Sequence, residues 1–302
     1  MTFGRSMKVL PAVAIAALAL APAANAALTP YQTAVLANSP VVYYPMDESS
    51  GTTANDLSGN SFNASYGVVY DATKTASPSP AITLGSSSAS SALNTAAAVT
   101  GGHGNGYDPV QLTGSGVTAL NGIGTNPFTV QFWFQTSLIN TSTTDREDLL
   151  DFRGTSPAAD LSMQVNNNDQ GGLTIFNSAG GNVITTSTNV ISANTWYMVT
   201  LTRDAGGTMT LYLNGSAINT GTDTDNINTG SSGILAIGNK ASGAAHLLDG
   251  SLDEFAFYNS ALSASTVATL YSTGSGTSVP EPASLSLLAL GGIALLARRR
   301  KA

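Results

Sequence analysis

The sequence predicts an all-β protein in which short antiparallel strands form a two-sheet sandwich or jelly roll, with one short helix near the end of the domain. Three observations support this class. Charged residues make up only 10% of the 302 residues. Gly, Ser, Thr and Asn, which suit turns and exposed strand faces better than amphipathic helices, are abundant. Short apolar segments recur between turn signals at regular intervals.

Period-two alternation of apolar and polar residues predicts the individual strands. They are expected at Phe128–Gln135, Trp196–Arg203, Met209–Leu213, Ile234–Gly238 and Ser251–Tyr258. The first is predicted to be half-buried, with Phe128 to Phe134 placing alternate apolar residues on one face. Asn214-Gly215 tolerates positive φ at both turn centres and predicts a hairpin, and Asp204–Gly207 predicts another tight turn. Ser263 is expected to cap a helix over Ala264–Tyr271.

Residues 1–26 are typical of a signal peptide. Arg5 and Lys8 give a positively charged start, an apolar run follows, and Ala24-Asn25-Ala26 has the small-x-small cleavage pattern. We expect cleavage after Ala26. The alternative is an uncleaved anchor, for which the apolar run is short.

The other end carries a tripartite tail. Residues 273–278 form a flexible linker, and 279–302 contain a Pro-Glu-Pro triplet, fifteen uncharged residues at 283–297 and a basic cluster. We expect the uncharged stretch to form a separate apolar helix that transiently spans the inner membrane, with its basic cluster on the cytoplasmic side. The residues that define the signal are Pro280, Glu281, Pro282, Arg298, Arg299 and Arg300.

This tail resembles a PEP-CTERM sorting signal. The resemblance implies processing near the Pro-Glu-Pro triplet by an exosortase-type enzyme of a Gram-negative bacterium, and a link to exopolysaccharide or biofilm matrix. It also implies that the domain reaches the cell surface, outer envelope or extracellular matrix. A permanent membrane anchor remains the alternative.

The composition of the middle of the chain excludes several classes of partner and site. Without the two tails, 5 basic and 17 acidic residues remain, a net charge of −12. Such a field repels nucleic acid phosphates, but neutral glycans, or anionic polymers bridged by a divalent cation, remain possible. The chain has no cysteine, so it has neither disulfides nor thiolate chemistry.

Four sequence blocks in the middle match a known pattern. They are Leu36–Tyr66, Phe128–Gln135, Asn194–Gly215 and Ile237–Ser263. They resemble the laminin G-like, concanavalin A-like jelly-roll domain, which we assign to residues 27–272. The resemblance implies that the first and last strands pair at the rim of a sheet. The Ser/Ala/Gly-rich segment at residues 85–126 departs from the family pattern, and the sequence does not indicate a role for this segment.

No catalytic arrangement is evident. Glycosidases need two carboxyls placed across the sugar, and no Glu-x-Asp-x-Glu string supplies them. We expect Asp145–Asp148 to be a solvated turn, and Asp253 and Glu254 to lie on opposite faces of a strand. Neither His103 nor His246 lies near a nucleophile elbow. The sequence therefore predicts that the protein is not an enzyme.

One structural calcium ion is the candidate cofactor. The resemblance implies a Ca²⁺ site, because many such domains hold one calcium ion. The candidate ligands are the carboxylate oxygens of Asp47, beside the first strand, and of Asp253, in the last strand. The alternative is that both are capping or turn carboxylates. Trp133 and Tyr212 are candidates for stacking on sugars, although strand aromatics usually lie in the core.

These observations predict a non-catalytic binding or adhesion module that recognises a glycan or a surface protein. The alternatives are a structural envelope or matrix component without a specific ligand, and a glycoside hydrolase.

Overall fold

The structure is a computed structural model. It describes residues 27–69, 81–90, 93–100, 107–113, 120, 123–137, 139, 146–153, 161–166, 170–177, 181–227, 233–239 and 247–276. The predicted signal peptide with Ala24 and Ala26, the linker from residue 277 onward and the whole sorting tail lie outside these residues. His103, His246 and Asp145 lie outside them as well.

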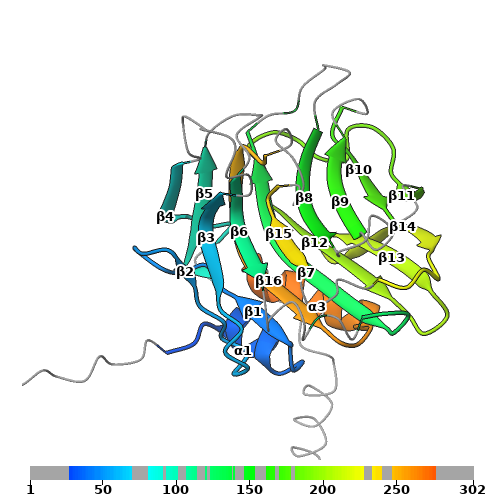
Figure 1. The fold of residues 1–302 in the computed structure, drawn as a ribbon, viewed down its shortest axis with the longest axis horizontal. Coiled ribbons are helices and arrows are strands. Elements are labelled where there is room, and N and C mark those ends of the chain that lie inside the picture. Colours follow the sequence, from blue (N-terminus) through cyan, green and yellow to red (C-terminus); the bar gives the residue numbers. More distant parts are fainter. Residues whose placement is uncertain are drawn as a thin grey trace, which may run out of the picture.

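The described residues form two antiparallel sheets stacked as layers, which confirms the predicted all-β sandwich (Figure 1). Sheet A contains β1 (Val42–Tyr44), β4 (Ala81–Ser87), β5 (Thr95–Thr100), β7 (Phe128–Thr136), β12 (Tyr197–Arg203), β13 (Thr208–Leu213), β14 (Ser216–Thr222) and β16 (Gly250–Tyr258). Sheet B contains β2 (Thr53–Ala54), β3 (Ala64–Val69), β6 (Tyr107–Thr113), β8 (Arg146–Arg153), β9 (Leu161–Asn166), β10 (Gly172–Phe176), β11 (Asn182–Thr185) and β15 (Ile234–Ile237).

The strand order joins segments that are far apart in the sequence. Sheet A runs β14-β13-β12-β7-β16-β5-β4, with β1 paired to β16, and sheet B runs β11-β10-β9-β8-β15-β6-β3-β2. Pairing of the first strand with the last, from Val42 opposite Phe257 to Tyr44 opposite Phe255, confirms the expectation from the resemblance. Residues 85–126 contribute to β4 at the edge of sheet A, to β5, and to β6 inside sheet B.

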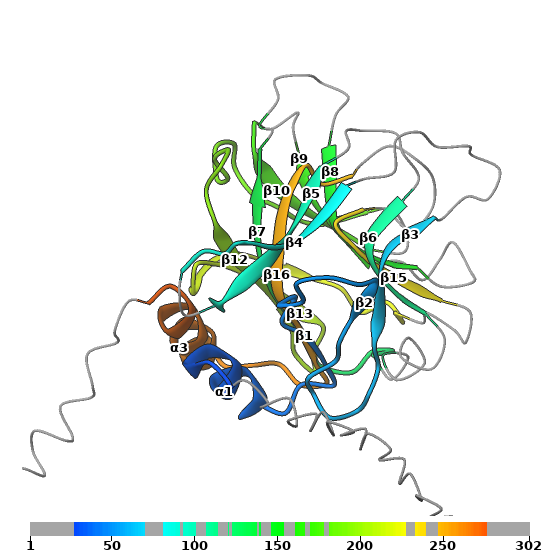
Figure 2. The same ribbon diagram turned by 90° about the vertical axis from the view of Figure 1, so that its left-hand side faces the viewer.

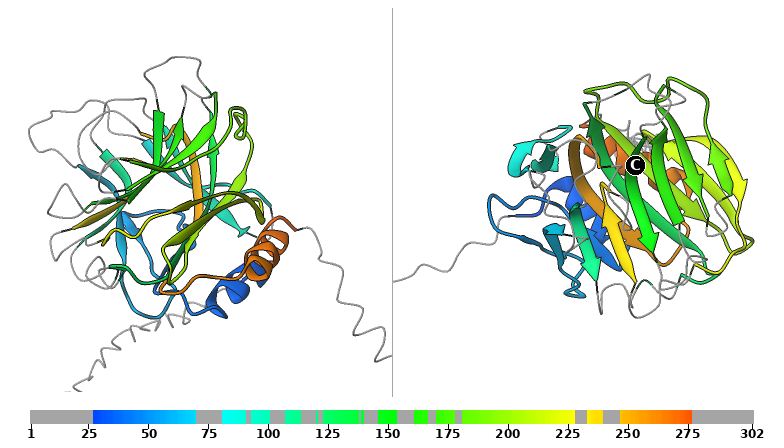
Figure 3. Two further views of the ribbon diagram at one scale, coloured as in Figure 1. Left: turned by 90° about the vertical axis from the view of Figure 1, so that its right-hand side faces the viewer. Right: turned by 45° about the horizontal axis from the view of Figure 1, so that its top comes forward.

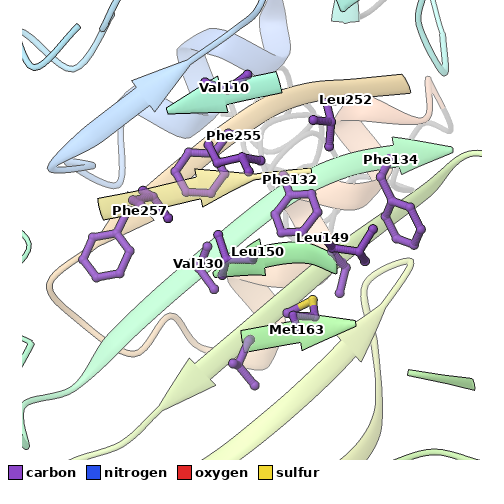
Figure 4. Packing of buried hydrophobic residues seen from close by; sticks show 14 of the residues in the cluster. Val110, Val130, Phe132, Phe134, Leu149, Leu150, Met163, Leu252, Phe255 and Phe257 are labelled. Atoms are coloured by element: carbon purple, nitrogen blue, oxygen red, sulfur yellow. The ribbon is translucent and has the colours of Figure 1, made fainter. Parts of the chain in front are cut away.

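The main core lies between the sheets (Figure 4). From β7 it receives Phe128, Val130, Phe132 and Phe134, as the alternation predicts. The prediction that this strand is half-buried is wrong, because Trp133 on its other face is only 2% exposed. Strand β7 is the inner strand of a sheet that is covered on both sides.

Two helices cover the outer face of sheet A (Figure 2). Helix α3 (Ala264–Gly274) begins after the predicted cap Ser263 and runs three residues further than expected. Helix α1 (Pro30–Leu36) was not predicted, although its Thr29 N-cap and Gln32 form a capping box in which each side chain accepts a hydrogen bond from the other residue's backbone N–H. Tyr31 packs edge-on against Trp133, with ring centroids 6.3 Å apart. The helices thus close a second, smaller core on this face.

The predicted turns are confirmed. Asn214 and Gly215 have φ of 49° and 79°, and they join β13 to β14. In the turn between β12 and β13, the Asp204 carboxylate accepts hydrogen bonds from the backbone N–H groups of Gly206 and Thr208. Local turn chemistry therefore sets this part of the sheet, as the sequence indicates.

Candidate functional site

The two faces of sheet B differ sharply in chemistry. Residues paired directly across neighbouring strands place their side chains on the same face. One unbroken row of such pairs crosses seven strands and belongs to the main core: Ile184, Ile175, Met163, Leu150, Ile237, Val110 and Tyr66. The inner face of sheet B is therefore apolar throughout this row.

The next row lies on the outer face and is mostly polar. It crosses the same seven strands through Asn182, Phe176, Ser162, Asp151, Ala236, Gln111 and Ser65. A parallel, shorter row contains Thr185, Thr174, Gln164 and Asp148. In the right-hand view of Figure 3 this sheet faces the viewer and the helices lie behind it. The outer face of sheet B is therefore a polar surface that α1 and α3 do not cover.

Exposure along these rows increases from the centre of the sheet to its edges. Asp151 and Gln111 are 1% and 7% exposed, whereas Asn182 is exposed and Phe176 and Ser162 are half-buried. Thr174 lies on the same face, and its hydroxyl has no hydrogen-bond partner within the described residues. A ligand would therefore reach this face at the β9–β11 end.

Phe176 is an aromatic side chain on this polar face that the sequence analysis missed. Its neighbours in the ladder are Ser162 and Asn182. The predicted stacking residues lie elsewhere, because Trp133 and Tyr212 are buried in the small core under the helices. The alternation of Gly172–Phe176 indicates that Phe176 faces away from the core residue Ile175, and this signal was available in the sequence.

Strand β8 brings two carboxyls to the outer face. The prediction that Asp145–Asp148 form a solvated turn is wrong. Glu147 and Asp148 lie in β8 and are 0% exposed. The register shifts between Asp148 and Leu150, so that Asp148 opposes Gln164 while Asp151 opposes Ser162. Since Gln164 and Ser162 are two residues apart on β9, the two aspartates are about 7 Å apart along the strand.

This spacing corrects the expectation that no carboxyl pair shares a face. A β-bulge adds one residue to β8, which makes a pair three residues apart equivalent to a pair two apart. Asp151 also forms an ion pair with Arg153, at 3.5 Å between Oδ2 and Nη2. The period-two rule cannot reveal such a pair, because the bulge changes the period locally.

Asp47 lies in the loop after β1 and accepts hydrogen bonds from three donors in two segments, α1 and the start of β5. Its carboxylate accepts hydrogen bonds from Gln32 Nε2 at 2.6 Å, from the Thr95 backbone N–H at 3.2 Å and from Asn94 Nδ2 at 3.4 Å. Burial raises the pKa of Asp47, while these donors oppose the increase. The hydrogen bond from Thr95 agrees with the alternative that Asp47 is a capping carboxylate.

Asp253 and Glu254 lie side by side in β16, and both are 0% exposed. The prediction that they point to opposite faces is wrong. Asp253 pairs with Trp133, and the register then shifts before Ala256, with Glu254 in the left-handed region at φ 56°. Asp253 therefore shares the outer face with Trp133, and Glu254 accepts a hydrogen bond from the Tyr43 hydroxyl on that same face. The bulge in β16 thus interrupts the alternation of side chains between the two faces, so that two consecutive residues share one face.

The contacts of Asp47 and Asp253 do not match a calcium cage. Ca²⁺ prefers six to eight oxygen ligands, but the oxygens of Asp47 already accept hydrogen bonds. Across the described ranges, no group of three or more His, Cys, Asp or Glu side chains is placed to hold a metal ion. The calcium ion therefore stays a prediction, and the described residues around Asp47 and Asp253 do not form a complete set of ligands for it.

A laminin G family model, described as the concanavalin A-like lectin/glucanases superfamily, matches residues 104–268. This match covers more than half of the chain. The chain belongs to the concanavalin A-like lectin/glucanase superfamily. A second model, described as a PEP-CTERM protein-sorting motif, matches residues 278–301.

The sorting motif determines where this concanavalin A-like protein goes. It is a signal for export and for exosortase-dependent sorting to the surface of a Gram-negative bacterium. Among the described residues no helix has the length and apolar character needed to span a membrane. The predicted span at 283–297 lies outside those residues.

Several solved structures share the fold of this concanavalin A-like chain. Domain 4 of a GH43 extracellular arabinanase from Geobacillus stearothermophilus, in complex with arabinotriose, is 18% identical at a TM-score of 0.54, covering 77% of this chain and 98% of that one. A Trypanosoma rangeli sialidase in complex with 2,3-difluorosialic acid is 13% identical at 0.52, covering 77% of this chain. The binding domain of botulinum neurotoxin serotype D is 15% identical at 0.51, covering 79% of this chain and 52% of that one.

These similarities establish the fold alone. The chain spans only 32% of the sialidase chain that it matches. The comparison with curated proteins finds no match.

Proposed function

We propose that this exported protein is a carbohydrate-binding module without catalytic activity, and that its glycan site is the outer face of sheet B around Phe176. The observation that carries the proposal is the polar row across sheet B. At its accessible end a half-buried aromatic ring lies between Ser162 and Asn182. An apolar ring flanked by hydroxyl and amide groups suits a sugar, which has apolar ring faces and polar edges.

Membership of the superfamily and the structures with carbohydrate ligands support this proposal. The superfamily contains lectins as well as glucanases by its own description. The arabinanase domain was solved with arabinotriose. Neither α1 nor α3 covers this face, and its residues are accessible at the β9–β11 end, where Ser162 and Phe176 are half-buried and Asn182 is exposed.

The proposal is tested by glycan-array and calorimetric binding with the exported protein and its Phe176→Ala variant. We expect binding to at least one neutral polysaccharide, and a loss of about tenfold or more in affinity for the variant, because the stacking surface disappears. Ile218→Ala is the matched control, since Ile218 is an exposed apolar residue on β14 of the other sheet, 39% exposed. It should bind as the parent protein does.

Two results would contradict the proposal. If no polysaccharide binds, a protein ligand or a structural matrix role without a ligand becomes the better account. If Phe176→Ala binds as tightly as the parent, the site lies elsewhere.

A glycoside hydrolase is the second candidate, because β8 places Asp148 and Asp151 on one face. Their spacing of about 7 Å along the strand is compatible with the carboxyl separation of about 6.5–9.5 Å in inverting glycosidases and is larger than the separation of about 5–5.5 Å in retaining ones. Against it, both aspartates are at most 1% exposed, and Asp151 forms an ion pair with Arg153. Release of reducing sugar from a polysaccharide that binds, abolished in Asp148→Asn and in Asp151→Asn, would establish catalysis and overturn the non-catalytic proposal.

A further inference from the structure

The start of α1 and the end of α3 meet at one corner of the helical layer, which is the layer that these two helices form on sheet A. There Gly274, the last residue of α3, packs against Tyr31 in the first turn of α1. A Cβ atom on Gly274 would lie 2.8 Å from Tyr31 Cε2 and 2.6 Å from Trp133 Cζ2. The chain therefore enters α1 and leaves α3 at the same corner of the domain.

Helix α3 is held firmly on the sheet up to its last turn. It buries Leu270 and Gly274, and the ring of Tyr271 stacks on Trp133 with the centroids 5.7 Å apart. The Ser90 hydroxyl also donates a hydrogen bond to the Gly274 carbonyl oxygen. The point at which the chain leaves α3 is therefore fixed relative to the rest of the domain.

The sorting tail follows this point after a short stretch of chain. The sorting motif matches residues 278–301. Only residues 277–282 separate Gly276 from the uncharged stretch at 283–297, for which we predict a transient span. Even when fully extended this connection reaches about 25 Å at most, whereas a compact domain of this size is about 45 Å across. Until the tail is cut, the face that carries α3 is therefore the face nearest the membrane.

The helical layer is free of charge on an otherwise acidic domain. Residues 27–46 and 255–280 contain no Asp, Glu, Lys, Arg or His, although 17 acidic and 5 basic residues lie between the two tails. Leu28, just before α1, is 45% exposed and is the most exposed large apolar side chain among the described residues. A bilayer with anionic headgroups repels an acidic surface within about 10 Å. A neutral face with an exposed leucine can approach such a bilayer closely.

We propose that the helical layer is the membrane-facing surface of this protein before its tail is processed, and that its partner is the phospholipid surface of the inner membrane. The inference rests on the sorting motif and the predicted span, and it is independent of the proposed glycan site. Leu28 buries its side chain among the lipid headgroups, and the neutral exposed side chains of α1 and α3 lie against them. The outer face of sheet B, on the opposite side of the sandwich, then points away from the membrane (Figures 2 and 3).

The test uses the chain with its sorting tail, reconstituted in vesicles of phosphatidylethanolamine and phosphatidylglycerol. Because the protein has no cysteine, one fluorophore can be attached at Thr33→Cys on α1, or at Ser65→Cys on the outer face of sheet B. Both positions are exposed. Quenching by lipids with nitroxide headgroups reports how close each position lies to the bilayer. We expect at least about threefold stronger quenching at position 33, because the two positions lie on opposite faces of a domain about 45 Å across.

Equal quenching at the two positions would overturn the proposal, because the domain would then turn freely on its linker. Stronger quenching at position 65 would overturn it as well, because the sheet would then face the lipid. The same holds if the protein does not float with the vesicles, since the tail would then hold no face of the domain at a bilayer.

A charge placed on the helical layer provides a second test. Ser265→Glu, at an exposed position in the first turn of α3, should reduce the quenching at position 33 about twofold in the anionic vesicles and less in phosphatidylcholine vesicles, because like charges repel. Ser65→Glu is the matched control, since it adds the same charge to the opposite face, and it should leave the quenching unchanged. Unchanged quenching in Ser265→Glu would mean that the layer does not contact the lipid.

Discussion

At the scale of single residues, Arg203 shows how a charge is accommodated in the interior. It lies at the end of β12 and is 0% exposed. Its guanidinium donates hydrogen bonds to the backbone carbonyls of Gly124, Asn126 and Asp225, at 2.6 to 3.3 Å. It also lies over the Phe128 ring, 5.1 Å from its centroid. The planar, multidentate guanidinium thus ties two loops to sheet A.

We predict that Arg203→Lys reduces the free energy of unfolding by about 2–4 kcal/mol, because an ammonium cannot reach these carbonyls together and leaves them unsatisfied in the interior. Urea unfolding measures the change. Arg153→Lys is the matched control on β8, where the side chain is 24% exposed, and should change stability by less than about 0.5 kcal/mol. Equal effects of the two substitutions would contradict the prediction.

Glu147 is a second buried charge, at the end of the sandwich where β8 meets β16. Its Oε1 accepts a hydrogen bond from the Asp249 backbone N–H at 3.1 Å, while Oε2 has no partner within the described residues. Burial raises the pKa of Glu147 to about 7, against hydrogen bonds from Thr136 and Asp249 that lower it. Folding therefore favours its protonated form.

We predict that Glu147→Gln stabilises the protein at pH 8 by up to about 3 kcal/mol and has little effect at pH 4. The raised pKa means that the stabilisation by the proton is present below pH 4.5 and is lost as the pH rises to about 7. Glutamine keeps the acceptor for Asp249 and removes the charge. Urea unfolding of the parent and the variant at both pH values measures the difference, and an equal effect at the two pH values would refute this account.

At the scale of elements, the edges of the two sheets come together where β14 meets β11. Gly221 of β14 lies so close to β11 that a Cβ atom would be 2.2 Å from the Val183 carbonyl oxygen and 2.9 Å from Ile184 Cγ1. The side of the sandwich thus closes by direct backbone approach. Only glycine permits this approach without displacing a strand.

We predict that Gly221→Ala reduces stability by about 1–3 kcal/mol, because the added methyl group forces β14 away from β11. A second glycine such as Gly276 is unsuitable as the control, because its positive φ would make an alanine strained for a reason unrelated to packing. Ala217→Ser on the same strand is the better control, because Ala217 is exposed. Thermal unfolding should show a lower Tm for Gly221→Ala alone, and an unchanged Tm would mean that the edge is not closed in solution.

Several elements could be predicted because their signals are local. Strand β7, the β12–β13–β14 hairpins and the Ser263 cap depend on residues close together in the chain, and the structure confirms them. Helix α1 was missed although Thr29, Pro30 and Gln32 carry its start signal, because seven residues give too short an apolar pattern.

At the scale of the whole molecule, we expect the net charge to favour neutral ligands over anionic ones. The chain between the tails carries a net charge of −12, and the proposed site is a face with uncharged residues at its accessible end. We predict that affinity for a neutral glycan is insensitive to salt, because no counter-ions are released on binding, while anionic polymers bind only with a divalent cation. Titrations at about 50 and 500 mM NaCl measure this, and a steep salt dependence for a neutral glycan would contradict it.

The sequence by itself determined the fold class, strands β7, β12, β13, β15 and β16 and the C-terminal sorting motif, because alternation, turn residues and the sorting motif depend on contiguous residues. The tertiary structure decided which polar residues share a face. The bulge after Asp253 arises where β16 pairs with β7, a strand far away in the chain, and the bulge after Asp148 arises where β8 pairs with β9, the next strand along the chain. Register between paired strands is a property of the assembled sheet, and a shift of one residue moves a side chain to the other face.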